Sequence, residues 1–305
     1  MTVYNFGSIN IDYVYRVERF VQPGETLASE SLDTVLGGKG ANQSVALARA
    51  GAPVVHLGRV SQADQWVVDE LASFGVDING IESVDEASGH AIIQVDAQGE
   101  NAIVLHGGAN QHFDAKSLAT LLKDAQPGDW LLLQNECNAL ADAFAIAQEK
   151  QLKIAFNPAP MNELAASLPL EHCQVLIVNE VEALQLANFG DVNGCSYSEA
   201  NADCQTELQK RYPGCQIVLT LGGKGAMLLH NGKCEKVDAA PVDAVDSTGA
   251  GDTFVGYFLA GLVNELAPEQ ALERACVAGA LAVTVAGATR GIPSRAAVEA
   301  FIKGK

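Results

Sequence analysis

The sequence lacks paired cysteines and long apolar runs. Its seven cysteines form no CxxC motif and are odd in number, which argues against both a zinc cluster and a disulfide framework. Free thiols are typical of a reducing compartment. No uncharged stretch reaches the ~20 residues that span a bilayer, and the chain opens without a basic and apolar leader. We therefore expect a cytoplasmic protein with no membrane partner.

Basic residues are also scarce, with 19 lysines and arginines against 37 acidic residues and a formal net charge of −18. Nucleic acids and anionic lipids are bound first through lysine and arginine, so this charge argues against a nucleic acid or any other polyanionic partner. A small phosphorylated ligand can still bind where backbone N–H groups, a helix N-terminus or a metal ion supply positive charge. We therefore expect Mg²⁺ wherever a nucleotide binds.

Two common nucleotide-binding motifs are missing. Lys39 and Lys224 are each followed by glycine rather than Ser or Thr, so neither glycine-rich segment is a P-loop. The first apolar run leads into residues 7–12, Gly-Ser-Ile-Asn-Ile-Asp, without a GxGxxG fingerprint. The sequence therefore argues against a dehydrogenase that uses a dinucleotide.

From residue 129 onward, short apolar runs alternate with helical stretches. This alternation predicts βαβ units and an α/β fold, in which a doubly wound, mainly parallel sheet carries helices on both faces. The last three helices are expected at about 249–262, 268–286 and 294–303. With 305 residues, 48% of them hydrophobic, the chain is long enough to bury a sizeable core. We expect one α/β domain over residues 1–305.

The first 110 residues show a different pattern, in which apolar and polar residues alternate singly. Residues 91–96 pair naturally with residues 102–106 across the turn Asp96-Ala97-Gln98-Gly99. We expect a small antiparallel sheet, built from about 11–36 and 90–106, that projects from the α/β body. Such a sheet beside a cleft can act as a lid that excludes water, although a plain edge hairpin is the alternative.

The stretch Asp246 to Phe254 places consecutive small residues between a β-rich run and a long helix. Small residues at a helix start leave backbone N–H groups uncovered, so Gly249, Ala250 and Gly251 can bind an anion such as phosphate. A carboxylate beside an anion site suits a general base that orients an attacking hydroxyl, which is the role we predict for Asp252. The alternative role for Asp252 is a helix N-cap.

Polar residues near the N-terminus are suited to a polyhydroxylated ligand. Asn10 and Asp12 lie two residues apart on an extended segment and so face the same way. The segment Gly37 to Asn42 adds close backbone approach, a lysine and an amide. Vicinal hydroxyls of a sugar suit such a cluster, while turn formation is the simpler explanation of Asn10 and Asp12.

Together with further motifs, these segments closely resemble the ribokinase-like carbohydrate kinase family over essentially the whole chain. The motifs that carry the resemblance follow one another in order at residues 7–12, 23–26, 37–42, 106–110, 157–160, 179–182, 220–222 and 246–254. The sequence departs from the family's usual pattern at residues 61–66, at Cys276 and at Gly291.

The resemblance implies a role for each matching residue. It implies that the sugar is bound by Asn10, Asp12, Gly38, Lys39, Asn42 and Glu136, with Asp252 at the hydroxyl that is phosphorylated. The residues it implies for ATP are Asn179, Thr220, Leu221, Gly222, Gly223, Lys224, Gly225 and Gly251. Glu182 would hold Mg²⁺ through water. A potassium ion would be held by Asp246, Thr248, Ala282, Val285, Gly287 and Gly291.

The resemblance implies an ATP-dependent kinase that phosphorylates the 5-hydroxyl of D-ribose and is activated by Mg²⁺ and K⁺. Deoxyribose, fructose, 2-keto-3-deoxygluconate and adenosine stay open as alternative acceptors. A non-catalytic sugar sensor on the same fold is a further alternative, although such a protein would be expected to lose Asp252 or its glycines. Because relatives often dimerise through the lid sheet, we also expect a homodimer.

Overall fold

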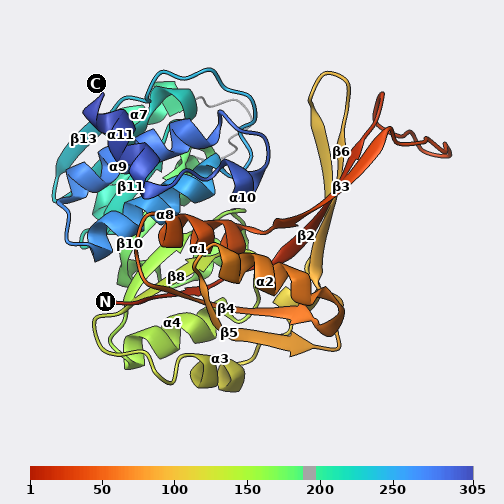
Figure 1. Ribbon diagram of the computed structural model, residues 1–305. Helices are drawn as coiled ribbons and strands as arrows, with labels where there is room; N and C mark the ends of the chain where they lie inside the picture. Colours follow the sequence, from red (N-terminus) through yellow and green to blue (C-terminus); the bar gives the residue numbers. More distant parts are fainter. Residues whose placement is uncertain (188–196, 305) are drawn as a thin grey trace.

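The computed structural model describes residues 1–187 and 197–304, so Cys195 lies outside the described residues. A nine-stranded sheet runs through the body of the molecule (Figure 1). Its central strands are parallel, and two antiparallel strands extend one edge. In spatial order the strands are β13 (Lys233–Val237), β12 (Ala226–His230), β11 (Gln216–Thr220), β10 (Cys173–Asn179), β9 (Lys153–Asn157), β8 (Trp130–Gln134), β1 (Val3–Phe6), β4 (Val54–Ser61) and β5 (Asp77–Val84).

Helices cover both faces of this sheet, which confirms the doubly wound α/β prediction. One face carries α1 (Lys39–Arg49), α2 (Gln65–Ser73), α8 (Ala250–Val263), α9 (Pro268–Ala282), α10 (Ala288–Gly291) and α11 (Arg295–Lys303). The other carries α3 (Ala115–Leu121), α4 (Leu140–Glu149), α5 (Glu163–Ser167), α6 (Glu180–Leu186) and α7 (Tyr197–Arg211). Within the described residues, no helix combines the length and hydropathy that a membrane span requires.

Central strands such as β8, Trp-Leu-Leu-Leu-Gln, are buried along their whole length. Neighbouring residues of β8 belong to different cores, since Leu132 packs with the α1 and α8 side and Leu131 with the α4 side. This is the period of two that a strand covered on both faces must show. The parallel strands are thus held between the two cores, and their carboxyl ends lie at one common edge of the sheet.

The lid is a separate four-stranded sheet that projects from the body (Figure 1). Its strands are, in spatial order, β3 (Ser31–Gly37), β2 (Asn10–Arg16), β6 (Gly89–Val95) and β7 (Asn101–His106), and they overlap the segments expected at about 11–36 and 90–106. The outer pairs, β3–β2 and β6–β7, are antiparallel as expected, whereas the central pair β2–β6 is parallel. That parallel pairing joins two hairpins that are far apart in the sequence.

Helices α1 and α8 cross unusually closely. A Cβ atom added at Gly256 would lie 2.4 Å from the Cβ of Ala46, so only a glycine allows this approach. Asp252 and Gly256 are four residues apart on α8, as are Asn42 and Ala46 on α1, so each pair shares one helix face. The crossing therefore brings the first turn of α8 against the first turn of α1.

Two predicted boundaries differ from the structure. The helix expected to reach residue 286 ends at Ala282, because the carbonyl oxygen of Val283 accepts hydrogen bonds from the backbone of Val245 and Asp246 instead. Strand β5 was not expected, because its sequence Asp-Ile-Asn-Gly-Ile-Glu-Ser-Val contains turn-forming residues. Pairing along β4 stabilises β5 despite that local preference.

Candidate active site

Four neighbouring parallel strands end in a polar side chain. Gln134, Asn157, Asn179 and Thr220 are the last residues of β8, β9, β10 and β11, respectively. Ligands of doubly wound folds bind at the carboxyl ends of such strands. A cavity of about 210 Å³ lies at this edge and includes Lys39, Asn157, Asn179, Glu182, Thr220, Gly249, Gly251 and Asp252 in its wall.

Asp252 is buried at the bottom of this cavity, with 8% of its surface exposed. Its Oδ2 accepts a hydrogen bond of 2.9 Å from Nδ2 of Asn42, and its Oδ1 accepts one of 2.9 Å from Nε2 of Gln43. Helix α8 has Gly249 as its N-cap, and Asp252 lies in the first turn. The N-cap alternative for Asp252 is therefore wrong, and the carboxylate faces the cavity with both oxygens fixed.

The start of α8 is open towards the cavity. Gly249 has φ 74°, a left-handed conformation that glycine adopts without strain, and a Cβ there would lie 2.9 Å from Ala288. The N–H of Ala250 donates to the carbonyl oxygen of Ser247, whereas nothing lies within 4 Å of the Cβ position of Gly251. The first hydrogen bond within α8 runs from the N–H of Thr253 to the carbonyl oxygen of Gly249. N–H groups that precede Thr253 can therefore contact an anion beside Asp252.

Lys39 lies between three acidic side chains that come from separate elements. The negative charges of Asp252, Glu136 and Glu182 raise its pKa, with Asp252 contributing most, while partial burial lowers it. The lysine therefore remains charged at neutral pH in the centre of the cavity. In a chain of net charge −18, this cation reduces the repulsion that a phosphorylated ligand meets.

Glu136 is held at the start of α1. Its Oε2 accepts hydrogen bonds from the hydroxyl of Ser8 and from the backbone N–H of Lys39, the latter at 3.1 Å. A carboxylate at a helix N-terminus is stabilised by the uncovered N–H groups. Glu136 is thus brought beside residues that lie about a hundred positions earlier in the chain.

Asp12 and Asn10 extend the site along lid strand β2. A Cβ atom at Gly37 would lie 2.1 Å from Oδ2 of Asp12, so a larger residue there would displace this carboxylate. Burial, and to a lesser extent Glu136, raises the pKa of Asp12 from 3.8 to about 6. Asn10 accepts a hydrogen bond of 2.8 Å from Nδ2 of Asn110, a residue to which we had assigned no role.

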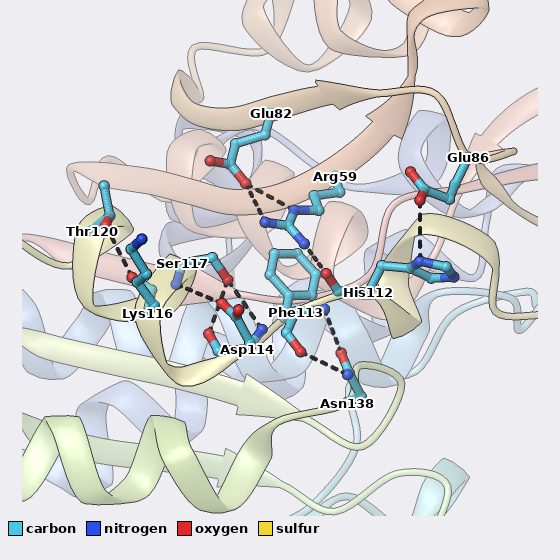
Figure 2. Close-up of polar contacts among 10 residues, drawn as sticks. All are labelled: Arg59, Glu82, Glu86, His112, Phe113, Asp114, Lys116, Ser117, Thr120 and Asn138. Carbon is cyan, nitrogen blue, oxygen red and sulfur yellow. Dashed lines mark hydrogen bonds and ion pairs between the residues drawn. The ribbon is translucent and has the colours of Figure 1, made fainter.

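The residues that follow Asn110, His112 to Asp114, are anchored to the body, as Figure 2 shows. The guanidinium of Arg59 lies over the ring of Phe113 at 4.5 Å and donates to Glu82. Asn138 exchanges two hydrogen bonds of 2.9 Å with the backbone of Phe113. These contacts join the segment after β7 to the loop that carries Glu136, and so hold both sides of the hydroxyl-binding region together.

The predicted nucleotide residues follow β10 and β11. Asn179 and Glu182 form a reciprocal capping box at the start of α6, with both hydrogen bonds 2.9 Å long. Thr220 lines the cavity and leads into a tight turn. Gly225 has φ 96° there, and its Cβ would lie 2.0 Å from the carbonyl oxygen of Val237. The turn contains the other expected nucleotide residues, Leu221, Gly222, Gly223 and Lys224.

The residues expected to hold potassium gather behind the start of α8. Asp246 accepts hydrogen bonds from the hydroxyl and N–H of Thr248 through Oδ1, and from the N–H of Gly287 through Oδ2. The carbonyl oxygens of Ala282 and Val285 both approach Gly291, at 2.8 and 3.2 Å from its Cβ position. In residues 1–187 and 197–304, no three His, Cys, Asp or Glu side chains cluster as metal ligands.

Comparison with known proteins identifies the class. The pfkB family of carbohydrate kinases matches residues 2–295, and this chain belongs to that family. It is therefore a carbohydrate kinase, as the sequence predicted.

Several similar proteins that match over nearly their full length are ribokinases, and another is a deoxyribokinase of Salmonella typhi, which is 30% identical over 301 residues with 96% of each protein covered. The chain is 33% identical over 303 residues to a ribokinase of Haemophilus influenzae, covering 97% of each protein. It resembles the structure of a Cryptococcus neoformans ribokinase in complex with ADP, with 35% identity, a TM-score of 0.85, and 98% and 99% coverage. It also resembles an Arabidopsis thaliana ribokinase complexed with ribose and ATP, with 28% identity, a TM-score of 0.83, and 99% and 98% coverage.

Replacing Asp12 with Asn should stabilise the folded protein at neutral pH. The pKa of Asp12 rises from 3.8 to about 6 on folding, so the folded state binds more protons between these values. The resulting penalty is absent below pH 3.8 and complete above pH 6. We expect urea unfolding to show a gain of about 2 kcal/mol at pH 7.5 and little gain at pH 4. Asp33→Asn on an exposed position of β3 is the control, and equal gains at both pH values would contradict the prediction.

Proposed function

We propose that this chain transfers the γ-phosphoryl group of ATP to the 5-hydroxyl of D-ribose. The observation that carries the proposal is the Asp252 carboxylate, buried and oriented by two amides beside the open start of α8. The similar Arabidopsis thaliana structure is described as complexed with ribose and ATP, which supports this pair of substrates. The chain would act as one α/β domain with its lid over the site.

In the proposed reaction, Asp252 accepts the proton of the attacking hydroxyl as the new O–P bond forms and the bond to ADP breaks. The N–H groups of Gly249 and Gly251 stabilise the transferring phosphoryl group, and Lys39 offsets its charge. The nucleotide would lie along Asn179, Thr220 and the turn that ends at Gly225.

Magnesium fits the acidic wall of the cavity. Burial raises the pKa of Glu182, while the N–H of Asn179 and the charge of Lys39 lower it. A carboxylate that is desolvated in this way gains from a nearby cation. Glu182 would therefore hold Mg²⁺ through water, and the ion would neutralise charge on the ATP phosphates.

The sugar would lie between the lid and α1. In our proposal, Asn10, Asp12, Asn42 and Glu136 contact ring hydroxyls, while Gly38 and Lys39 close the site. Gly38 has φ 94°, and its Cβ position lies 2.9 Å from the backbone of Asn10, so only glycine allows this close approach. With the ring held there, the exocyclic CH₂OH group points at Asp252.

Asp252→Asn should lower kcat by at least about 10²-fold while sugar binding remains measurable. The amide keeps the shape of the side chain but cannot accept the hydroxyl proton. Steady-state kinetics and sugar binding by calorimetry test this, with Asp243→Asn at an exposed position as the control. Turnover near that of the unmodified enzyme would remove Asp252 from the mechanism.

D-ribose should be the best acceptor in an ADP-release assay, with the phosphate placed on O5 by NMR. A buried polar group left unpaired costs ~1–3 kcal/mol, so 2-deoxyribose should lose about ten- to a hundredfold in kcat/KM. Adenosine should be poorer because the charged Lys39 and its glycines leave little apolar room for a base. If fructose or adenosine exceeds ribose, the acceptor is wrong although the kinase assignment stands. A sugar sensor would release no ADP with any of these sugars.

Potassium should raise activity more than sodium or lithium. Two carbonyl oxygens converge near Gly291, and Asp246 is bound to the loop that precedes Gly249, so a larger cation fits a site behind the anion-binding residues. By fixing that loop, the ion would preorganise the N–H groups. Titration of dialysed enzyme at constant ionic strength tests the site, and a flat response would show that no monovalent cation acts there.

We also propose a cytoplasmic homodimer that associates through the lid. Five of the described cysteines are free thiols, which suits a reducing compartment: Cys137, Cys173, Cys204, Cys215 and Cys234. The lid exposes large apolar side chains of the kind that marks an interface, with Leu32, Ile92 and Val104 on one face and Ile103 and Leu105 on the other. Sedimentation of the unmodified chain and of Val104→Glu distinguishes this dimer from a monomer.

A further inference from the structure

Behind Asp252, a chain of buried amide side chains crosses the sheet. Gln43 Nε2 donates to Asp252 Oδ1 at 2.9 Å and to Asn157 Oδ1 at 3.1 Å. Gln43 Oε1 accepts from Gln134 Nε2 at 2.7 Å, and Gln134 Nε2 also donates to Asn5 Oδ1 at 2.9 Å. Gln43, Gln134 and Asn5 are almost completely buried, so the hydrogen bonds among these three side chains form without competition from water.

Backbone carbonyl groups at both ends determine the orientation of every amide in this chain. Asn5 Nδ2 donates to the carbonyl oxygen of Gly40 at 2.8 Å, and Asn157 Nδ2 donates to that of Ile177 at 2.9 Å. A carbonyl oxygen can only accept, so Asn5 and Asn157 must turn their own oxygens inward. Gln134 must then donate to both Asn5 and Gln43, which turns the NH₂ group of Gln43 towards Asp252.

The same chain stabilises a fixed carboxylate geometry. The two N–H bonds of Gln43 are shared between Asp252 and Asn157, so its NH₂ group has no freedom to follow another ligand. Oδ2 of Asp252 is bound instead by Asn42, whose own Oδ1 has no hydrogen-bond partner in the described part of the chain. The two oxygens of Asp252 therefore have different environments, one facing the protein interior and one facing Asn42.

We propose that Gln43 is a positioning residue for phosphoryl transfer. Oδ1 of Asp252 is then held by the buried amide chain, and Oδ2 accepts the proton of the acceptor hydroxyl. The inference rests on the proposed function of Asp252. Hydrogen bonds from NH₂ groups favour the ionised carboxylate and hold its plane at the angle that the hydroxyl needs. The charged groups around Asp252 are Lys39 on α1 and, through Lys39, Glu182 on α6 and Glu136 after β8.

The test compares Gln43→Met with Ser44→Ala. Methionine keeps the length and volume of glutamine but donates no hydrogen bond. Ser44 is the next residue of α1 and is equally buried; its hydroxyl accepts from Asn5 at 2.7 Å and pairs with His56 at 2.8 Å, but it does not touch Asp252. Because Gly40 still orients Asn5, Ser44→Ala removes hydrogen bonds from the same cluster without reversing any amide.

We expect Gln43→Met to lower kcat about tenfold or more and to change KM for ribose less than about twofold. In the plot of kcat against pH, the acid limb should move to a pH about one unit higher. Ser44→Ala should lower the melting temperature about as much as Gln43→Met does, but it should leave kcat and its pH dependence unchanged. If Gln43→Met does not fold, Gln43→Asn, which is too short to reach Asp252, should produce the same kinetic changes.

Two results would overturn the proposal: an unchanged kcat and acid limb in a folded Gln43 variant, or the same shift of the acid limb in Ser44→Ala. Failure of the proposed function itself has a different signature, because the unmodified protein would then release no ADP with ribose. If Asp252→Asn is inactive while the Gln43 variants behave like the unmodified enzyme, Asp252 is the base and Gln43 is only a packing residue.

Discussion

The close crossing of α1 and α8 is the contact on which the site depends. Gly256 lets Ala46 approach to a distance that no other residue would allow, and one turn earlier the same geometry places Asn42 and Gln43 against Asp252. The partners are 209 and 210 residues apart in sequence. Because both helices pack on one face of the sheet, two rigid elements rather than loops determine the position of the carboxylate.

The electrostatics of the site follow from the small number of basic residues. The chain places Asp252, Glu136 and Glu182 around Lys39, and the backbone N–H groups at the start of α8 add further positive partial charge. Fixed dipoles of this kind need no reorganisation when charge develops in the reaction. A carbohydrate kinase can therefore bind ATP despite a net charge of −18, provided that the local field differs in sign from the overall one.

Local sequence signals predicted the fold class well but not every element. Strands β8, β12 and β13 have the expected bounds because their apolar runs are bounded by turn residues. Strand β5 was missed because its stability comes from pairing with β4 rather than from its own composition. Gln134 and Asn157 were missed as site residues, although Gln134 ends the apolar run 130–134 and Asn157 directly follows the apolar run 154–156, at the carboxyl edge of the sheet.

The sequence by itself determined the order of the motifs, the small residues at the start of α8 and the candidacy of Asp252, since these depend on neighbouring residues and helix-start chemistry. Only the tertiary structure decided which amides meet that carboxylate and in which orientation. Asn5, Gln43, Gln134 and Asn157 come from β1, α1, β8 and β9, and their hydrogen bonds exist only once strand order and helix crossing are formed. Periodicity reports which face of an element is buried, but it carries no information about which distant element covers that face.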